Sequence, residues 1–178
     1  MTHMSKLASF FLVIFCWVTL AIPTLAQPIT FDNQKVVYDL PSPGLLPDHP
    51  LYFIKAIRDR LTEFATNDPL KKVELYLSYS DKRAQMALDL SKKGKNSLAI
   101  STISKGEKYF MKIPGILREA EKQNVKATDE FKYNLTLSNL KHREVIETLL
   151  KELPQGENEA LTQVLELNKA ISMDLERL

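Results

Sequence analysis

The chain has 178 residues, of which 24 are Lys or Arg and 22 are Asp or Glu, and the two signs of charge are interspersed along it. This near balance excludes the basic stripe that nucleic-acid-binding proteins carry, so we expect no nucleic acid partner. Beyond residue 26 the chain contains no cysteine, which excludes disulfide bonds, thiol catalysis and thiolate metal sites in that part.

Residues 1–26 have the pattern of a secretory signal peptide. Lys6 precedes an uncharged apolar run over residues 7–22, and Pro23 and Ala26 belong to a cleavage site of small residues. We therefore expect cleavage after Ala26 and an extracytoplasmic location, either secreted or in the cell envelope. The alternative is an uncleaved N-terminal helix that anchors the chain, because the run is close to the shortest that spans a bilayer. Only in that case do we expect contact with a membrane.

Residues 27–47 are predicted to form an extended, proline-rich arm. Three of its prolines fix φ near −65° and push the residues before them out of the helical region. Gly44 allows the chain to turn just before Leu45 and Leu46, which should dock as an apolar plug. A short strand-like patch surrounds Val36 and Val37.

Residues 48–178 are predicted to form an all-α domain, an antiparallel bundle of about five helices. Apolar residues recur there at three- and four-residue steps, the spacing that places them on one face of a helix. The predicted helices span about residues 48–66, 69–93, 96–123, 128–153 and 157–177.

Capping residues set the predicted helix ends. Asp48 is the predicted N-cap of the first helix, and Asp68 caps the second, with Pro69 at its first position. Gly94 should close the second helix in the left-handed conformation. Pro114 removes a backbone donor from the third helix, so we expect a kink or a break there.

The first two helices are predicted to form an antiparallel hairpin. Their apolar stripes should then be buried, in particular Leu51, Ile54, Leu61, Leu70 and Leu77.

The same hairpin would place Lys55 or Arg58 opposite Asp81. One interpretation is an acid–base or anion site, and the other is a cross-helix ion pair that fixes the hairpin. We favour the ion pair, because charged neighbours on two helices do not by themselves make an active site.

Two histidines lie outside the predicted signal peptide. His49 should steer the first turn of its helix through a hydrogen bond, and His142 lies on an apolar stripe, as a core histidine paired with a hydroxyl or carboxylate does. Two distant histidines give no metal-ligand spacing, and the chain has no HExxH, GxSxG, P-loop or glycine-rich dinucleotide turn. We therefore expect no enzyme activity, no catalytic residue, no cofactor and no metal.

Several segments are similar to a known family: PGLLPDHPLYF over 43–53, RDR over 58–60, DPLKK over 68–72 and DKR over 81–83. Together they resemble exported bacterial proteins with an uncharacterised helical domain, the domain of unknown function 5667. The resemblance extends over about residues 38–152, and Ser80 stands where that family often has alanine. It implies a helical domain outside the cytoplasm and no assigned activity.

Three classes of function follow, in this order. The first is a non-enzymatic extracytoplasmic module that binds a protein, a peptide or an envelope component, with the partner unknown. The second is an extracytoplasmic ligand- or metal-sensing helical domain. The third is an enzyme, which an open cleft at His142 would support.

Overall fold

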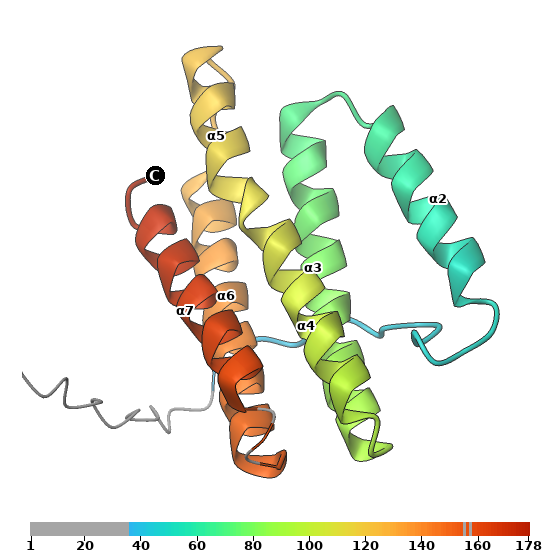
Figure 1. The fold of residues 1–178 in the computed structure, drawn as a ribbon. Helices are drawn as coiled ribbons and strands as arrows, with labels where there is room; N and C mark the ends of the chain where they lie inside the picture. The colour runs from blue at the N-terminus through green and yellow to red at the C-terminus, as the bar shows by residue number, and fades with distance from the viewer. Residues whose placement is uncertain (1–35, 155, 157) are drawn as a thin grey trace, which may run out of the picture. The chain divides into compact units, whose positions relative to one another are not determined.

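The computed structural model describes residues 36–154, 156 and 158–178, so the predicted signal peptide and its cleavage site lie outside the described part of the chain. The helices there are α2 (Tyr52–Ala65), α3 (Pro69–Lys92), α4 (Asn96–Phe110), α5 (Lys112–Lys122), α6 (Asp129–Glu152) and α7 (Asn158–Leu175) (Figure 1). The described residues contain no strand, including the patch at Val36 and Val37. The all-α prediction is confirmed, with α4 and α5 together forming the predicted third helix.

Helices α3 and α6 begin or end at capping residues of the kind that the sequence predicts. The Asp68 carboxylate accepts a hydrogen bond of 2.8 Å from the Lys71 backbone N–H, with Pro69 at the first position of α3. The Thr128 hydroxyl accepts from the Phe131 N–H at 3.2 Å and starts α6 in the same way. Gly94 follows α3 with φ +70°, in the left-handed region that lets a helix end.

Asp48 does not cap the first helix, so that prediction was wrong. A run of turns delays the helix until Tyr52, and Leu51 precedes it without a capping side chain. Asp48 instead accepts hydrogen bonds from Lys93 Nζ at 3.2 Å and Lys95 Nζ at 3.0 Å. These contacts join the turn that follows the arm to the residues just after α3.

The predicted break in the third helix lies at Met111, where α4 ends and α5 begins. Pro114 is the third residue of α5, where its missing N–H interrupts no hydrogen bond within that helix. Gly106 has a separate role, because α4 crosses α3 closely there. A Cβ at Gly106 would lie 3.1 Å from Cβ of Arg83 and 3.3 Å from the carbonyl oxygen of Ser80.

The core has two apolar clusters, one toward each end of the bundle. The first cluster includes Leu90, Ile103, Ile146, Leu149 and Leu165. The second cluster includes Val73, Phe110, Leu117, Leu135 and Ile171. A layer of buried polar residues separates the two clusters along α3, α4, α6 and α7: Asp81, Glu107, His142 and Asn168.

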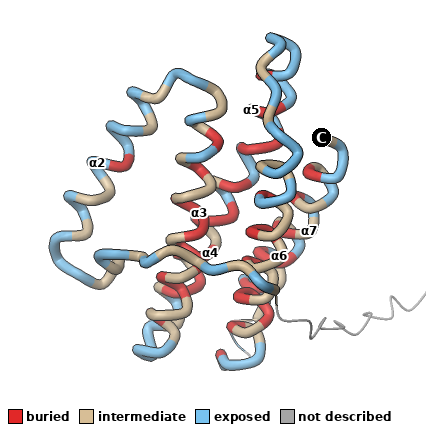
Figure 2. The backbone as a smooth tube through the Cα atoms, turned by 180° about the vertical axis from the view of Figure 1, so that it is seen from behind, coloured by how far each residue is buried: buried red, intermediate tan, exposed pale blue. Residues whose placement is uncertain are grey.

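The hairpin of α2 and α3 is antiparallel, but the residues predicted to be buried in it were largely wrong. Leu51, Ile54 and Leu61 are 50%, 53% and 64% exposed, while Leu70 and Leu77 are half-buried. In Figure 2 the burial colours show α2 mostly exposed, whereas α3 is buried over much of its length. The physical reason is that α2 turns its polar face toward α3.

Polar contacts hold α2 in place. The Tyr79 hydroxyl donates to the Asp59 carbonyl oxygen at 2.9 Å, and the Tyr76 hydroxyl donates to Glu63 Oε1 at 2.7 Å. Lys55 Nζ donates to the Pro43 carbonyl oxygen at 2.7 Å, which also ties the arm to α2.

Candidate functional site

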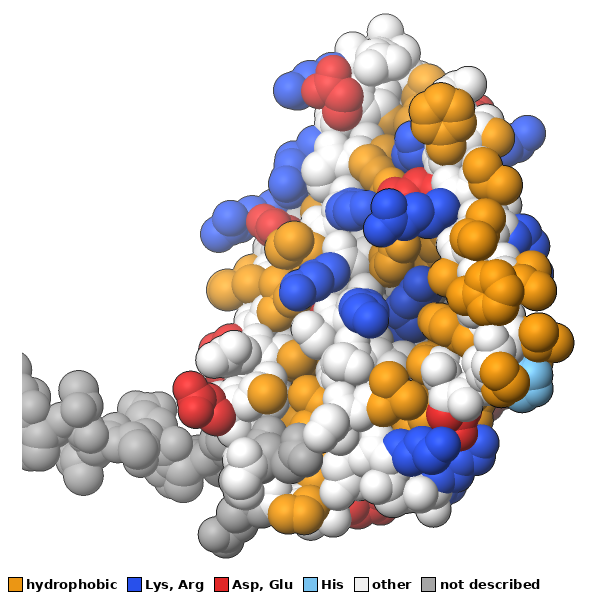
Figure 3. All heavy atoms as spheres, turned by 45° about the vertical axis from the view of Figure 1, so that its right-hand side comes forward, with side chains coloured by type: hydrophobic (Ala, Val, Ile, Leu, Met, Phe, Trp, Pro, Cys, Tyr) orange, Lys and Arg blue, Asp and Glu red, His pale blue; other side chains and the backbone are white. Residues whose placement is uncertain are grey.

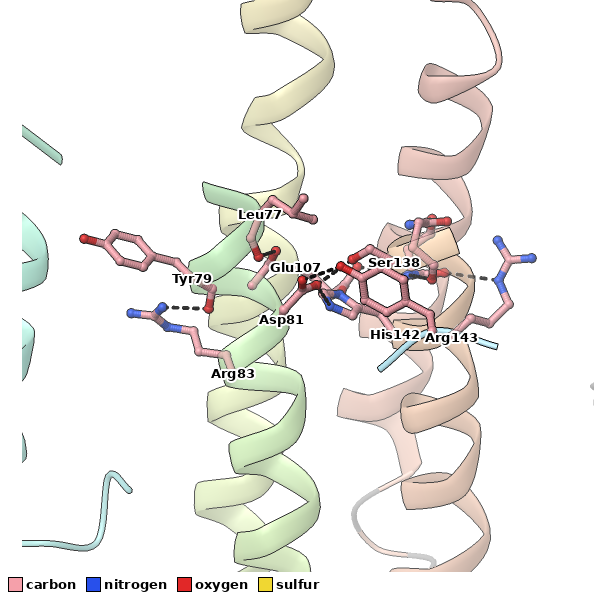
Figure 4. Close-up of polar contacts among 12 residues, drawn as sticks. Leu77, Tyr79, Asp81, Arg83, Glu107, Ser138, His142 and Arg143 are labelled. Carbon is pink, nitrogen blue, oxygen red and sulfur yellow. Dashed lines mark hydrogen bonds and ion pairs between the residues drawn. The ribbon is translucent and has the colours of Figure 1, made fainter. Parts of the chain in front are cut away.

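The main group of titratable residues in the core is the polar layer. Asp81 comes from α3, Glu107 from α4 and His142 from α6, and their side chains converge between the helices (Figure 4). Each residue stands at an inward position of its helix, so packing of the helices brings the three together. His142 and Glu107 are 0% exposed and Asp81 is 4% exposed.

The imidazole of His142 lies between the two carboxylates. Its Nδ1 is 2.7 Å from Glu107 Oε1, and its Nε2 is 2.9 Å from Asp81 Oδ1. The ring of Phe110 meets the imidazole edge to face, with ring centres 5.4 Å apart. This geometry suits a doubly protonated imidazole that donates one hydrogen bond to each carboxylate.

The charge state of His142 follows from two opposing effects. Burial by itself lowers the pKa of His142, because it disfavours the charged ring. The charge of Glu107 and the hydrogen bonds that the ring donates to both carboxylates outweigh burial and raise the pKa to about 9. At neutral pH the layer therefore contains an imidazolium between two acids.

The remaining carboxylate lone pairs also have donors. Asp81 accepts hydrogen bonds from the hydroxyl of Ser138 and, at 2.7 Å, from the hydroxyl of Tyr38 in the arm. Glu107 Oε2 accepts from the Asn168 amide at 3.1 Å. Burial and the Asp81 charge raise the pKa of Tyr38, so its hydroxyl remains a donor. The arm thus contributes one side chain to the centre of the bundle.

The structure confirms His142 as a core histidine paired with carboxylates, and it shows that the predicted pairing of Lys55 or Arg58 with Asp81 was wrong. Asp81 points into the bundle, and Arg58 instead bonds to its neighbour Asp59 at 2.8 Å. His49 Nδ1 accepts from the Leu51 N–H at 3.1 Å, the predicted local contact.

Sequence reasoning missed Glu107. It stands four residues after Ile103 and three before Phe110, inside an apolar stripe. An acid at such a position is the signal that could have indicated a partner for His142. Asn168 on α7 gives the same signal, since it lies between Leu165 and Ile171.

Enclosure limits what the polar layer can do chemically. A substrate would need to reach the ring nitrogens of His142, and both are already bonded to carboxylates within a buried layer. Among the described residues, no group of three or more His, Cys, Asp or Glu has the arrangement of a metal site. The polar groups of the layer are instead bonded to one another across α3, α4, α6 and α7.

A second feature lies on the surface. Five large apolar residues form one stripe on the outer side of α2: Phe53, Ile54, Ile57, Leu61 and Phe64. We call them the apolar face of α2. Each is more than half exposed, and Phe64 is 86% exposed. Figure 3 shows apolar side chains gathered in a ridge, with Lys and Arg side chains beside it.

Two pockets flank the apolar face. One has a volume of about 670 Å³ and is lined by Arg60, Glu63, Phe64, Lys72, Tyr76, Tyr109 and Lys112. The other has a volume of about 250 Å³ and is lined by Ser42, Pro43, Gly44, Leu45, Lys55, Arg58 and Lys82. Both pockets have more basic than acidic side chains.

A family model for a domain of unknown function (DUF5667) matches residues 44–156. The chain belongs to the DUF5667 family. The DUF5667 match includes all of α2 to α6, and therefore the apolar face of α2 together with Asp81, Glu107 and His142. Comparison with curated proteins and with solved structures gave no match. Within the part of the chain that the structure describes, no helix is both long and apolar enough to cross a membrane.

Proposed function

We propose that this DUF5667 domain is a non-enzymatic, extracytoplasmic interaction module that binds a protein or peptide through the apolar face of α2. The observation that carries the proposal is the exposure of five large apolar residues on one side of a single helix. Surface residues of this kind are usually scattered singly, and a contiguous stripe indicates a binding surface.

The size of the apolar face supports this role. The five side chains expose on the order of 600 Å², if each has a full area of roughly 200 Å². This is the upper end of the range for the largest apolar patch on a monomer, about 300–600 Å². A standard protein–protein interface buries about 800 Å² on each partner, so the face could supply most of one.

The arrangement of α2 also supports binding. Its apolar residues follow steps of three and four, as in helices that dock along a partner. Hydrogen bonds from Tyr76, Tyr79 and Lys55 fix the opposite side of the helix. A helix that is already formed and held loses less entropy on binding than a disordered segment does.

A non-enzymatic role is supported by the enclosure of the polar layer. His142, Glu107 and Asp81 together resemble catalytic side chains in type, but they are buried and bonded to one another. General acid–base catalysis requires the group to come within hydrogen-bond reach of the substrate.

The extracytoplasmic location is supported by the signal-peptide pattern of residues 1–26. We expect the chain isolated from the secreted or envelope fraction to begin at Gln27, as measured by intact mass. A species that still contains Trp17 would show instead that the apolar run is retained as an anchor.

The apolar face can be tested by two matched pairs of variants. Ile57→Ser with Leu61→Ser should change the melting temperature little, because both side chains are exposed. It should weaken partner binding at least tenfold, through loss of about 200 Å² of apolar contact. A photoreactive phenylalanine at position 64 should give a defined protein adduct in cells, and the double variant should abolish that adduct.

The control changes the exposed residues Tyr133 and Met173, which lie on α6 and α7, to Ser. This pair should leave the adduct intact. A large fall in melting temperature for Ile57→Ser with Leu61→Ser would show that the face packs within the chain itself. Equal adducts in the two pairs of variants would show that the face does not bind the partner.

A further inference from the structure

The charges around the apolar face of α2 are unevenly placed. Arg58 lies one helical turn from Ile54, and Arg60 lies one turn from Phe64, so a basic residue borders each edge of the face. The Arg58 side chain is 68% exposed. The outer side of α2 is therefore apolar along its middle and basic along both edges.

The two acidic residues of α2 turn the other way. Asp59 is buried and accepts from Arg58 at 2.8 Å. Glu63 accepts from the Tyr76 hydroxyl at 2.7 Å and from Lys112 Nζ at 3.1 Å. Burial by itself raises the pKa of Glu63, but the bonds from Tyr76 and Lys112 outweigh it and lower the pKa. Asp59 thus balances Arg58, and Glu63 balances Lys112, but neither acid pairs with Arg60 at the other edge of the face.

Further basic residues lie in the two flanking pockets. Lys72 and Arg60 line the larger pocket, and Lys82 lines the smaller one. Within the described residues, these three side chains form no ion pair. Their charges are therefore free to meet acidic groups of a partner.

We propose that the apolar face of α2 pairs with an amphipathic helix of a partner protein whose apolar stripe is flanked by Asp and Glu. This inference rests on the proposed function and names the chemistry of the partner. Apolar contact along the stripe supplies attraction, while acids at its edges meet Arg60, Lys72 and Lys82. The match of charge decides which amphipathic helix binds.

A second copy of this chain fits less well. Pairing by two-fold symmetry brings the same surface of two copies together. The edges with Arg58 and Arg60 would then face identical edges, and like charges across an interface are unfavourable. Charge complementarity therefore favours a different, acidic protein.

An anionic membrane would also attract basic residues. However, the basic side chains line two separate pockets of about 670 and 250 Å³ on the two flanks of α2. Side chains of a protein partner can enter such pockets, whereas headgroups at a bilayer surface form a continuous layer. The geometry therefore favours a helix with protruding carboxylates.

The experiment uses two helical peptides of equal length and with the same leucine stripe, one with Glu at the edges and one with Lys. Binding to the purified chain is measured by fluorescence anisotropy. The Glu peptide should bind about tenfold more tightly than the Lys peptide, and added salt should reduce this preference. Arg60→Glu with Lys82→Glu should reverse the preference.

The matched control is Lys108→Glu with Lys126→Glu, which changes the net charge equally at sites away from α2. Lys108 lines a depression between α4 and α7, and Lys126 lies between α5 and α6. This control should keep the preference for the Glu peptide. Melting temperatures of both charge variants establish that each is folded.

The remaining outcomes overturn the inference. If both peptides bind equally and Ile57→Ser with Leu61→Ser abolishes that binding, the proposed function stands but the inference of an acidic partner is wrong. If the peptides bind equally well to the wild type and to that variant, the proposed function itself is wrong. Binding only to vesicles that contain phosphatidylglycerol would indicate a membrane. A dimer that is detected by sedimentation and is lost in Ile57→Ser with Leu61→Ser would indicate that the face binds a second copy of the chain. If neither peptide and no vesicle binds, the inference of an acidic partner is wrong.

Discussion

Replacement of His142 by Leu is expected to lower the free energy of unfolding by about 3–5 kcal/mol, the range for removing one partner of a buried ion pair. The variant leaves Asp81 and Glu107 inside the bundle with no positive charge between them, and both are almost completely buried. Leu has nearly the volume of His, so a new cavity contributes little. Denaturation in urea at pH 7 measures the difference.

A double variant separates charge from packing. Glu107→Leu with His142→Leu removes one acid and the cation together, and it leaves Asp81 with its hydroxyl donors Tyr38 and Ser138. Replacing a buried charged pair with apolar residues is often close to neutral in stability. We therefore expect the double variant to be more stable than His142→Leu alone. If His142→Leu lowers the free energy of unfolding by less than about 1 kcal/mol, the buried charges contribute little to the stability of the fold.

Helix positions in this chain could be predicted because their signals are local. Asp68 and Pro69 start a helix through backbone chemistry that depends on a few neighbouring residues. Gly94 ends a helix in the left-handed region, and Pro114 lacks a backbone N–H wherever the helix packs, so a break close to it is expected. Such signals do not depend on which other helix is nearby.

The side of α2 that faces the bundle could not be predicted in the same way. The spacing of Ile54, Ile57 and Leu61 correctly places them on one face of a helix, but spacing does not say what covers that face. Here Asp59 and Glu63 find hydrogen-bond partners on α3, so the polar side of α2 turns inward. The error arose from the assumption that the chain itself buries every apolar stripe.

The polar layer could be predicted only in part. His142 on an apolar stripe indicates a buried histidine with a polar partner, but the partner comes from another helix. Asp81 was instead expected to face α2, because a hairpin of neighbouring helices is the simplest pairing. The position of Glu107 opposite His142 depends on the packing of α4 against α6, which no local pattern contains.

The polar layer supports the surface that we propose for binding. The polar layer lies between two apolar clusters, where a slip of any helix would leave buried carboxylates unpaired. That penalty favours a single arrangement of α3, α4, α6 and α7. A bundle with one arrangement gives α2 a fixed support. The arm reinforces this support through Tyr38, which bonds to Asp81, and through Pro43, which accepts from Lys55 of α2. If the apolar face of α2 binds a partner as we propose, this support would give the complex a defined orientation.

The domain is also expected to lose about 3 kcal/mol of stability as pH rises from 6.5 to 9. The pKa of His142 is about 9 in the folded chain and about 6.5 in the unfolded one. Between these values the folded state holds a proton that the unfolded state has released, so unfolding becomes easier by about 1.4 kcal/mol per pH unit. The contribution is fully present below pH 6.5 and is lost as pH passes through about 9.

Urea denaturation at half-unit steps from pH 6 to 9.5 measures this slope, and the range ends before most tyrosines and lysines titrate. The titratable groups that contact His142 are Asp81 from α3 and Glu107 from α4, with Tyr38 bonded to Asp81 from the arm. His142→Leu is the control, because it lacks the titrating ring and should show a flat profile. His49→Leu should retain the slope, since His49 is exposed and bonds only to a local N–H. A wild-type profile that is flat, or one that His142→Leu shares, would mean that the folded and unfolded states hold the His142 proton equally.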